Sequence, residues 1–194
     1  EEEMEYFDKA AETASASRLK ETQLDRLKRV LSHVETRVPY YRGAFEKAGF
    51  KPGKVASLAD LAAAPFTVKS VLRDNYPFGL FTMPAGEVAE IHASSGTTGK
   101  MTVVGYTRND IKLWGTVMAR SLACGGVRTG DIVHNAYGYG LFTGGLGVHY
   151  GALELGAPVV PVSVGQTQRQ LALMTDFKAT VLTCTPSYAL NLAE

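Results

Sequence analysis

Seven consecutive residues near the middle of the chain form its densest group of potential ligand donors. They are Ser94, Ser95, Gly96, Thr97, Thr98, Gly99 and Lys100. Glycines let backbone N–H groups come close to ligand oxygens, hydroxyls donate further hydrogen bonds, and lysine adds a mobile positive charge. This combination favours polyphosphate binding over the alternative, a plain polar turn between two strands.

This segment matches neither of two well-known motifs of similar composition. A Walker A loop needs glycine at the place of Ser94 and a hydroxyl residue at the place of Met101. A GxSxG nucleophile elbow needs glycine at the place of His92. The phosphate-binding prediction therefore rests on the composition of the segment alone.

A second candidate segment, residues 137–145, alternates aromatic rings with glycines. Its candidate substrate-binding residues are Tyr137, Tyr139, Phe142, Gly144 and Gly145. It follows a predicted strand, and in open α/β sheets ligands bind beyond the carboxyl ends of the strands. Such a segment can wall an aromatic pocket with little backbone bulk. The alternative, rings that only fill space between sheet and helix, is favoured by the residues alone.

Other polar residues carry weaker signals. The junction Thr183-Cys184-Thr185-Pro186-Ser187 could point hydroxyls at a ligand or cap a helix, and capping is the favoured interpretation. The four histidines lack the spacing of a metal site, and none is assigned as a catalytic base. The two cysteines form no CxxC motif, so a reducing cytoplasm is the default compartment.

The elements that must position these segments change in character near residue 85. Before it, apolar residues spaced by three and four predict an amphipathic helix that Pro39 closes, with Leu24, Leu27, Leu31, Val34 and Val38 on one face. A short helix ending at Gly49 and a capping box at Ser57 and Asp60 are expected to follow.

After residue 88 strands and helices alternate. Strands are predicted at 88–93, 102–106, 131–135, 157–162 and 180–183. Helices are predicted after Thr107, near 145–155, near 166–174 and from Pro186. This rhythm predicts an α/β fold, in which a mostly helical segment (1–85) precedes a doubly wound, largely parallel sheet (86–194) that binds nucleotide and substrate.

The composition excludes several classes of protein. The chain has 194 residues, with 20 Lys and Arg against 19 Asp and Glu, which gives a formal charge of +1. A charge-driven partner such as nucleic acid is therefore not expected. Residues 132–153 carry no charged side chain, but their glycines and polar residues do not suit a membrane-spanning helix.

Three stretches of the chain resemble, in order and spacing, the N-terminal portion of the phenylacetate–CoA ligases, which belong to the adenylate-forming superfamily. They read IHASSGTTGKMTVVGYT, HNAYGYGLFTGGLGVHYG and VLTCTPSYALNLAE. RVPYYR and DNYPFGLF resemble the family too, so the resemblance runs from about residue 20 to the end of the chain.

The resemblance implies ATP-dependent ligation of phenylacetate or a related aryl acid to coenzyme A, through an acyl-adenylate that leaves AMP and pyrophosphate. It places the ATP phosphates at residues 94–100, with Lys100 as the catalytic residue, and the aryl ring at Tyr137 and Phe142, with Tyr139 in the same segment. It also implies that the enzyme uses Mg²⁺, whose ligands lie outside these residues. The resemblance further implies a cytoplasmic enzyme of phenylacetate catabolism with small-molecule partners, and it allows a homodimer.

Two departures from the family pattern matter. Lys100 precedes Met101 where such loops commonly have proline, which should leave the end of the loop freer. The sequence ends at Glu194, before the acidic motif, ribose-binding aspartate and catalytic lysine of the family, so we expect a fragment of the large N-terminal domain that is inactive alone. Two alternatives remain open: a non-catalytic nucleotide- or phosphate-binding module, and an adenylyltransferase of the same superfamily with another acceptor.

Overall fold

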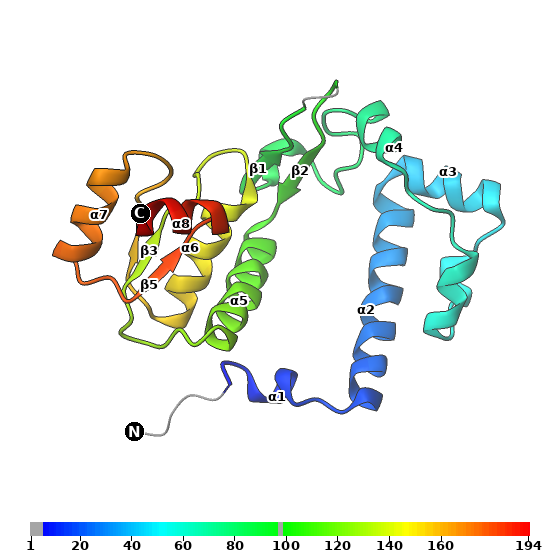
Figure 1. The fold of residues 1–194 in the computed structure, drawn as a ribbon. Helices are drawn as coiled ribbons and strands as arrows, with labels where there is room; N and C mark the ends of the chain where they lie inside the picture. The colour runs from blue at the N-terminus through cyan, green and yellow to red at the C-terminus, as the bar shows by residue number, and fades with distance from the viewer. Residues whose placement is uncertain (1–5, 97–98) are drawn as a thin grey trace. The chain divides into compact units, whose positions relative to one another are not determined.

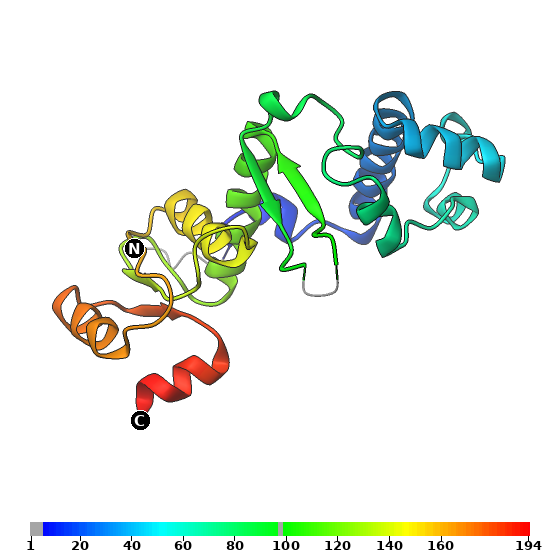
Figure 2. The same ribbon diagram turned by 90° about the horizontal axis from the view of Figure 1, so that it is seen from above.

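The structure, a computed structural model, describes residues 6–96 and 99–194 (Figures 1 and 2). The chain folds as two compact units. The helical unit is Thr13–Gly105, and the α/β unit joins Tyr106–Glu194 with the N-terminal Glu1–Glu12. The contacts thus divide the chain after Gly105, whereas the functional division expected after residue 85 stays a prediction. None of the helices in the described part of the chain is long and apolar enough to cross a membrane.

The helical unit begins with its longest helix and continues through short ones. Its elements are α2 (Ala16–Arg37), α3 (Pro39–Ala48), the 3₁₀ helices Pro52–Lys54 and Leu58–Ala63, α4 (Lys69–Asp74), the 3₁₀ helix Ala85–Glu87, β1 (Glu90–Ala93) and β2 (Val103–Tyr106). The two strands pair in a two-stranded sheet, with the predicted phosphate-binding segment between them.

The apolar stripe of α2 forms the core of the helical unit. Leu31 is buried there with Phe45, Phe50 and Val55, and Leu24, Leu27, Val34, Tyr41 and Ala64 pack around them. The helix begins after Ser15, whose hydroxyl accepts from the Arg18 N–H, and ends at Arg37, so that Pro39 starts α3. The predicted spacing, the stop at Gly49 and the capping box at Ser57 and Asp60 are all confirmed.

The α/β unit contains a parallel sheet with helices on both faces. Its elements are α1 (Lys9–Glu12), α5 (Arg108–Cys124), β3 (Val133–Asn135), α6 (Thr143–Leu155), β4 (Val159–Val160), α7 (Thr167–Asp176), β5 (Val181–Thr183) and α8 (Pro186–Ala193). The strand order is β4-β3-β5, and β3 runs parallel to both neighbours.

The central strand β3 explains why helices cover both faces of this sheet. Successive side chains of a strand point to opposite faces, and all three residues of β3 are fully buried. Val133 packs in a core with α5 and α6 residues, whereas His134 hydrogen-bonds Gln170 of α7. Helices α6 and α7 therefore lie on opposite faces, as Figure 1 shows. The predicted parallel sheet with helices on both faces is confirmed, and it is formed by β3, β4 and β5, whereas the strands predicted at 88–93 and 102–106 form the separate sheet β1–β2.

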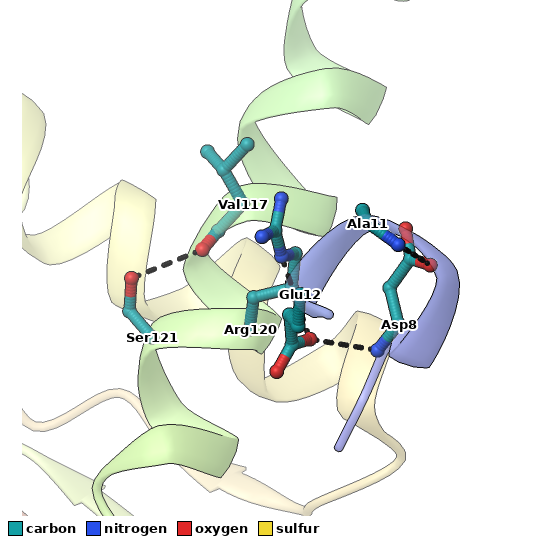
Figure 3. Close-up of polar contacts among 6 residues, drawn as sticks. All are labelled: Asp8, Ala11, Glu12, Val117, Arg120 and Ser121. Atoms are coloured by element: carbon teal, nitrogen blue, oxygen red, sulfur yellow. Dashed lines mark hydrogen bonds and ion pairs between the residues drawn. The ribbon is translucent and has the colours of Figure 1, made fainter. Parts of the chain in front are cut away.

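The N-terminal segment is fastened to α5 of the same unit (Figure 3). Phe7 packs against the apolar core around Val133. The Glu12 carboxylate accepts from the backbone N–H of Asp8 at 2.7 Å and pairs with Arg120 of α5 at 3.4 Å. An apolar anchor and an ion pair thus hold residues 7–12 on the α/β unit, although the sequence in between belongs to the helical unit.

Candidate functional site

The predicted phosphate-binding segment, hereafter the donor loop (residues 94–100), closes the β1–β2 hairpin. Ser94 fixes its base, because its backbone N–H donates to the Thr102 carbonyl and its hydroxyl accepts from the Thr102 N–H, each at 3.0 Å. Ser95 and Lys100 are exposed to solvent, and the predicted donors Thr97 and Thr98 lie outside the described residues.

The turn of the donor loop requires glycine at position 96. Gly96 has φ of 65°, in the left-handed region that residues with a Cβ rarely adopt. A Cβ there would also lie 2.6 Å from Cγ of Met101. The carbonyl of Gly96 accepts from the N–H of Gly99 at 3.0 Å. This hydrogen bond and the left-handed backbone of Gly96 define the turn in the described part of the loop.

The side chain of Lys100 lies beside an aromatic ring of the same unit. Its Nζ is 5.9 Å from the ring centroid of Tyr76, within the range of a cation–π contact. Such a contact at an exposed site contributes about 0.5–1 kcal/mol, so it is weak enough for a phosphate to displace. Lys100 therefore has both the charge and the freedom that the predicted role needs.

The second predicted group, hereafter the aromatic segment (residues 137–145), runs from the carboxyl end of β3 into α6. Three of its predicted residues, Tyr137, Tyr139 and Gly145, hydrogen-bond Asn135, the last residue of β3, while Phe142 is 59% exposed. The amide nitrogen of Asn135 donates to the Tyr139 hydroxyl at 2.7 Å and to the Gly145 carbonyl at 2.8 Å. The Asn135 side chain thus joins the middle of the segment to the first turn of α6.

Close packing between loop and helix requires glycine at position 145. A Cβ on Gly145 would lie 2.5 Å from the Gly138 carbonyl oxygen, closer than any real contact. A Cβ on Gly144 would lie 3.8 Å from the Tyr137 ring, an ordinary contact distance. Gly145 therefore lets α6 begin directly against the backbone that carries the predicted aromatic residues.

The Tyr139 phenol is held in its neutral form. Burial raises the pKa of Tyr139 above its usual value, and the hydrogen bond from Asn135 acts weakly in the opposite direction. The Tyr139 hydroxyl also forms a hydrogen bond with His149 Nδ1, 3.2 Å away. The Tyr139 hydroxyl thus has two hydrogen-bond partners, Asn135 and His149, and its role toward a substrate stays a prediction.

A cavity of about 330 Å³ opens at the carboxyl ends of the parallel strands. Its lining combines Ala136 and Tyr137 after β3, Val164 and Gly165 after β4, and Thr185, Ser187, Tyr188 and Asn191 after β5. The lining residues carry no charge, and two of them are aromatic. This is the position at which open α/β sheets bind their ligands, and its chemistry suits an uncharged aromatic group.

The strand-to-helix junction after β5 departs from its favoured interpretation. Thr185 is the N-cap residue of α8, but its side chain makes no capping hydrogen bond within the described residues. Its hydroxyl instead lies 3.4 Å from that of Ser187, and both line the cavity. The capping hydrogen bond favoured for this junction is therefore not made, because the N–H of Tyr188, at the third helical position, donates at 3.0 Å to the backbone carbonyl of Thr185 instead.

Sequence reasoning missed the buried polar residues that shape the two sides of the cavity. Asn135 lies within the stretch HNAYGYGLFTGGLGVHYG, but no role was predicted for it, and none was predicted for Gln170. Gln170 donates to the carbonyls of Ser163 at 3.0 Å and Gly165 at 2.7 Å, while its oxygen accepts from His134 at 2.9 Å. For Asn135 the available signal was a polar residue in a strand expected to be buried, whereas Gln170 is the one buried residue of α7 in the described part of the chain, so the pattern of that helix gave no signal.

The structure therefore brings the predicted residues together in two groups. Ser94, Gly96, Gly99 and Lys100 belong to the hairpin of the helical unit, and the aromatic segment belongs to the α/β unit. Their roles toward ligands stay predictions. Within the described residues there is no group of three or more His, Cys, Asp or Glu that could hold a metal ion.

Comparison with known proteins finds enzymes that are similar to nearly the whole of this chain. It is 57% identical to the phenylacetate–coenzyme A ligase of Thermus thermophilus, over 94% of this chain and 41% of that protein. It is 54% identical to the Escherichia coli phenylacetate–coenzyme A ligase over 94% of this chain and 42% of that protein. The chain is homologous to the N-terminal portion of the phenylacetate–coenzyme A ligases. No protein-family model matches the chain.

Solved structures agree with the homology to these ligases. A crystal structure of 2-hydroxyisobutyryl-CoA ligase in complex with 2-HIB-AMP and CoA matches with a TM-score of 0.91 and 32% identity, over 97% of this chain and 42% of that chain. An open conformation of that ligase matches with a TM-score of 0.91 and 31% identity over the whole of this chain. The chain spans about two fifths of the length of the curated relatives it matches.

Proposed function

We infer that the protein carrying this chain ligates phenylacetate, or a related aryl acid, to coenzyme A through an acyl-adenylate. The observation that carries this inference is 54–57% identity to phenylacetate–coenzyme A ligases over 94% of the chain. The donor loop and the uncharged cavity beside Tyr137 supply the two kinds of binding surface that the reaction needs, one for phosphates and one for an aromatic ring.

The proposed reaction has two steps. A carboxylate oxygen of the acid attacks the α-phosphorus of ATP, and pyrophosphate leaves with the bonding electrons. The sulfur of coenzyme A then attacks the acyl carbon of the adenylate, and AMP leaves as its phosphate oxygen takes the electron pair. In the first step the N–H and hydroxyl groups of the donor loop would hold the phosphate oxygens, and Lys100 would offset the charge that develops on pyrophosphate.

The aryl ring would lie in the α/β unit, where Tyr137 lines the cavity and Phe142 offers an exposed aromatic face. Offset or edge contacts between rings add about 0.5–1.5 kcal/mol beyond burial. Since the described residues offer no cluster of acidic metal ligands, Mg²⁺ would come with the phosphates of ATP, and we assign no residue of this chain to it.

The proposal concerns a protein of about the length of its relatives. A polypeptide of only these 194 residues offers about two fifths of that length, so we expect it to make no phenylacetyl-CoA over many turnovers. The proposal includes the cytoplasm as the compartment and allows a homodimer, which light scattering on the purified protein would test.

The decisive experiment measures acid-dependent exchange of pyrophosphate into ATP with the product of the complete reading frame that encodes this chain. We expect exchange with phenylacetate, little with acetate, and release of AMP and phenylacetyl-CoA when coenzyme A is added. Nucleotide binding without exchange would identify a binding module instead. Exchange without thioester formation would identify an adenylyltransferase with another acceptor.

A further inference from the structure

Asn135 occupies an unusual position for a polar side chain. It ends the central strand β3, its exposed fraction is 0%, and it stands directly before the two residues that line the cavity on this side. Burial of an amide is unfavourable unless its hydrogen bonds are satisfied, so such a residue has a structural or functional reason to be there.

The Asn135 amide uses its full hydrogen-bonding capacity. Its nitrogen donates to the Tyr139 hydroxyl and the Gly145 carbonyl. Its oxygen accepts from the Tyr137 backbone N–H at 3.3 Å and from the Thr183 hydroxyl at 3.0 Å. An amide offers two N–H donors and two oxygen lone pairs, so all four are occupied.

These partners also fix the orientation of the amide. The Gly145 carbonyl can only accept a hydrogen bond, and the Tyr137 N–H can only donate one. A flipped amide would therefore place its nitrogen against an N–H and its oxygen against a carbonyl. The assignment of nitrogen and oxygen follows from the chemistry of the partners, and no other side chain of this size matches the same four partners.

The four hydrogen bonds connect three parts of the α/β unit. Three hold the aromatic segment, at Tyr137, at Tyr139 and at Gly145 in the first turn of α6, and one holds Thr183 at the end of β5. The Tyr139 hydroxyl extends the connection to His149 of α6. Tyr137 is thus held at the cavity directly, through its own backbone N–H, and indirectly, through the hydrogen bonds of Asn135 to Tyr139 and Gly145.

We propose that Asn135 is a positioning residue that sets the selectivity for the acid, by fastening the aromatic segment to α6 and β5 so that Tyr137 walls the cavity. This inference rests on the proposed function for its statement about the acid. Asn135 itself need not touch the substrate, because its side chain has no hydrogen-bonding group left to offer.

The test replaces Asn135 by Asp, which keeps the shape of the side chain. The carboxylate cannot donate to Tyr139 or Gly145, and it would face the Gly145 carbonyl oxygen across 2.8 Å in the present geometry. Asn109→Asp is the matched control, because it makes the same chemical change at an exposed position of α5. Thr183→Val is a milder second variant that removes the hydroxyl donating to the Asn135 oxygen at 3.0 Å and to the His134 carbonyl at 3.4 Å, and it leaves the Asn135 donors intact.

Two measurements on the product of the complete reading frame separate the outcomes. Amide hydrogen exchange of residues 137–145 should be at least about tenfold faster in Asn135→Asp and less affected in Thr183→Val, with other segments of the protein unchanged. The KM for phenylacetate should rise at least about tenfold while the KM for ATP changes by less than about threefold. Asn109→Asp should match the wild type in both.

Each outcome decides the inference. Unchanged exchange at 137–145 in a folded Asn135→Asp protein would overturn it, and so would equal changes in the KM values for acid and ATP. If Asn135→Asp does not fold, the same readouts in Thr183→Val decide. If the wild type exchanges no pyrophosphate with any acid, the proposed function fails, and hydrogen exchange alone then decides whether Asn135 positions the segment.

Discussion

The donor loop and the aromatic segment are held in opposite ways, although both are predicted to meet parts of one reaction. The donor loop turns at Gly96 and keeps Ser95 and Lys100 exposed, and its base is fastened by Ser94 and Thr102. The aromatic segment is fastened from within by the buried amide of Asn135. One loop presents its polar groups to solvent, while the other depends on a polar group that solvent cannot reach.

The difference follows from the ligands that the two segments are predicted to bind. Phosphate oxygens form directional, charge-assisted hydrogen bonds, so a ligand can complete the order of a loop of exposed donors. An aromatic ring offers no such bonds, and its selectivity depends on the shape of a wall that the protein must build beforehand. Substitutions of the exposed donor-loop residues Ser95 and Lys100 should therefore change ligand binding alone, whereas substitutions beneath the aromatic segment should change stability as well.

The largest effect is expected from Gly145→Ala in the aromatic segment. The added Cβ would lie 2.5 Å from the Gly138 carbonyl oxygen, so loop and helix must separate. We expect a loss of about 2 kcal/mol in the free energy of unfolding, as for other overpacked sites. Urea denaturation followed by fluorescence of Trp114, the only tryptophan, measures the change in this unit.

The matched control is Gly43→Ala inside α3 of the helical unit. A Cβ on Gly43 would meet no atom within 4 Å, so alanine should stabilise that helix by about 0.5–1 kcal/mol. Circular dichroism at the helical band would follow it. Equal effects of the two alanines would mean that the loop does not approach α6 as closely as described.

Lys100→Ala should produce the next largest effect, and only on the chemistry. Loss of the positive charge at the donor loop should lower acid-dependent pyrophosphate exchange at least about tenfold, which corresponds to about 1.4 kcal/mol of transition-state stabilisation. The exposed Lys100 makes only a weak ring contact, so the free energy of unfolding should stay within about 0.5 kcal/mol of the wild type. Lys20→Ala, an exposed lysine of α2, is the control. Normal exchange by Lys100→Ala would remove this residue from the site.

Phe142→Ala should have a smaller effect, confined to the acid. The ring is 59% exposed, so its removal should leave stability unchanged. If it packs against the aryl ring of the substrate, the loss is about 1 kcal/mol, or about a fivefold rise in the KM for phenylacetate, with the KM for ATP unaltered. Steady-state kinetics with each substrate varied in turn would show the split. Equal weakening of both substrates would make Phe142 a packing residue.

Local sequence patterns predicted the elements of both units well, because those elements depend on local chemistry. The spacing of Leu24, Leu27 and Leu31 describes the buried face of α2. The pair of Thr107 and Asp110 forms the capping box of α5, with hydrogen bonds in both directions. Strand–helix alternation was enough to predict the parallel sheet, since a parallel pair of strands needs a crossover between them.

The internal fastening of the cavity could not be predicted in the same way. Asn135 and Thr183 are 48 residues apart, and their contact depends on the pairing of β3 with β5. Thr185 was expected to cap α8 because local statistics favour that role, yet its hydroxyl lies at the cavity. Local patterns fix neither the strand register nor the partner that a buried polar group finds.

The smallest effect is expected at the opposite end of the same two strands, where the polar group is ionisable. The Asp131 carboxylate accepts two hydrogen bonds, from the Thr180 hydroxyl at 2.7 Å and from the Arg128 backbone N–H at 2.6 Å. These two hydrogen bonds, that from Thr180 foremost, hold the pKa of Asp131 below its usual value of 3.8. A carboxyl whose pKa is lowered by folding stabilises the protein above its unfolded pKa, and this stabilisation is lost as the pH falls through the folded pKa.

Asp131→Asn should therefore lower the free energy of unfolding by only a few tenths of a kcal/mol near neutral pH, because this carboxyl is largely solvated. The difference in the free energy of unfolding between Asp131→Asn and the wild type should become smaller as the pH falls below about 4. At Asn135 the same strands are joined by an amide that does not titrate, so its variants should show no such dependence on acidity. Urea denaturation of Asp131→Asn and wild type at about pH 7 and about pH 3 measures the narrowing. A difference of equal size at both values would mean that the hydrogen bonds of Asp131 do not favour its charged form.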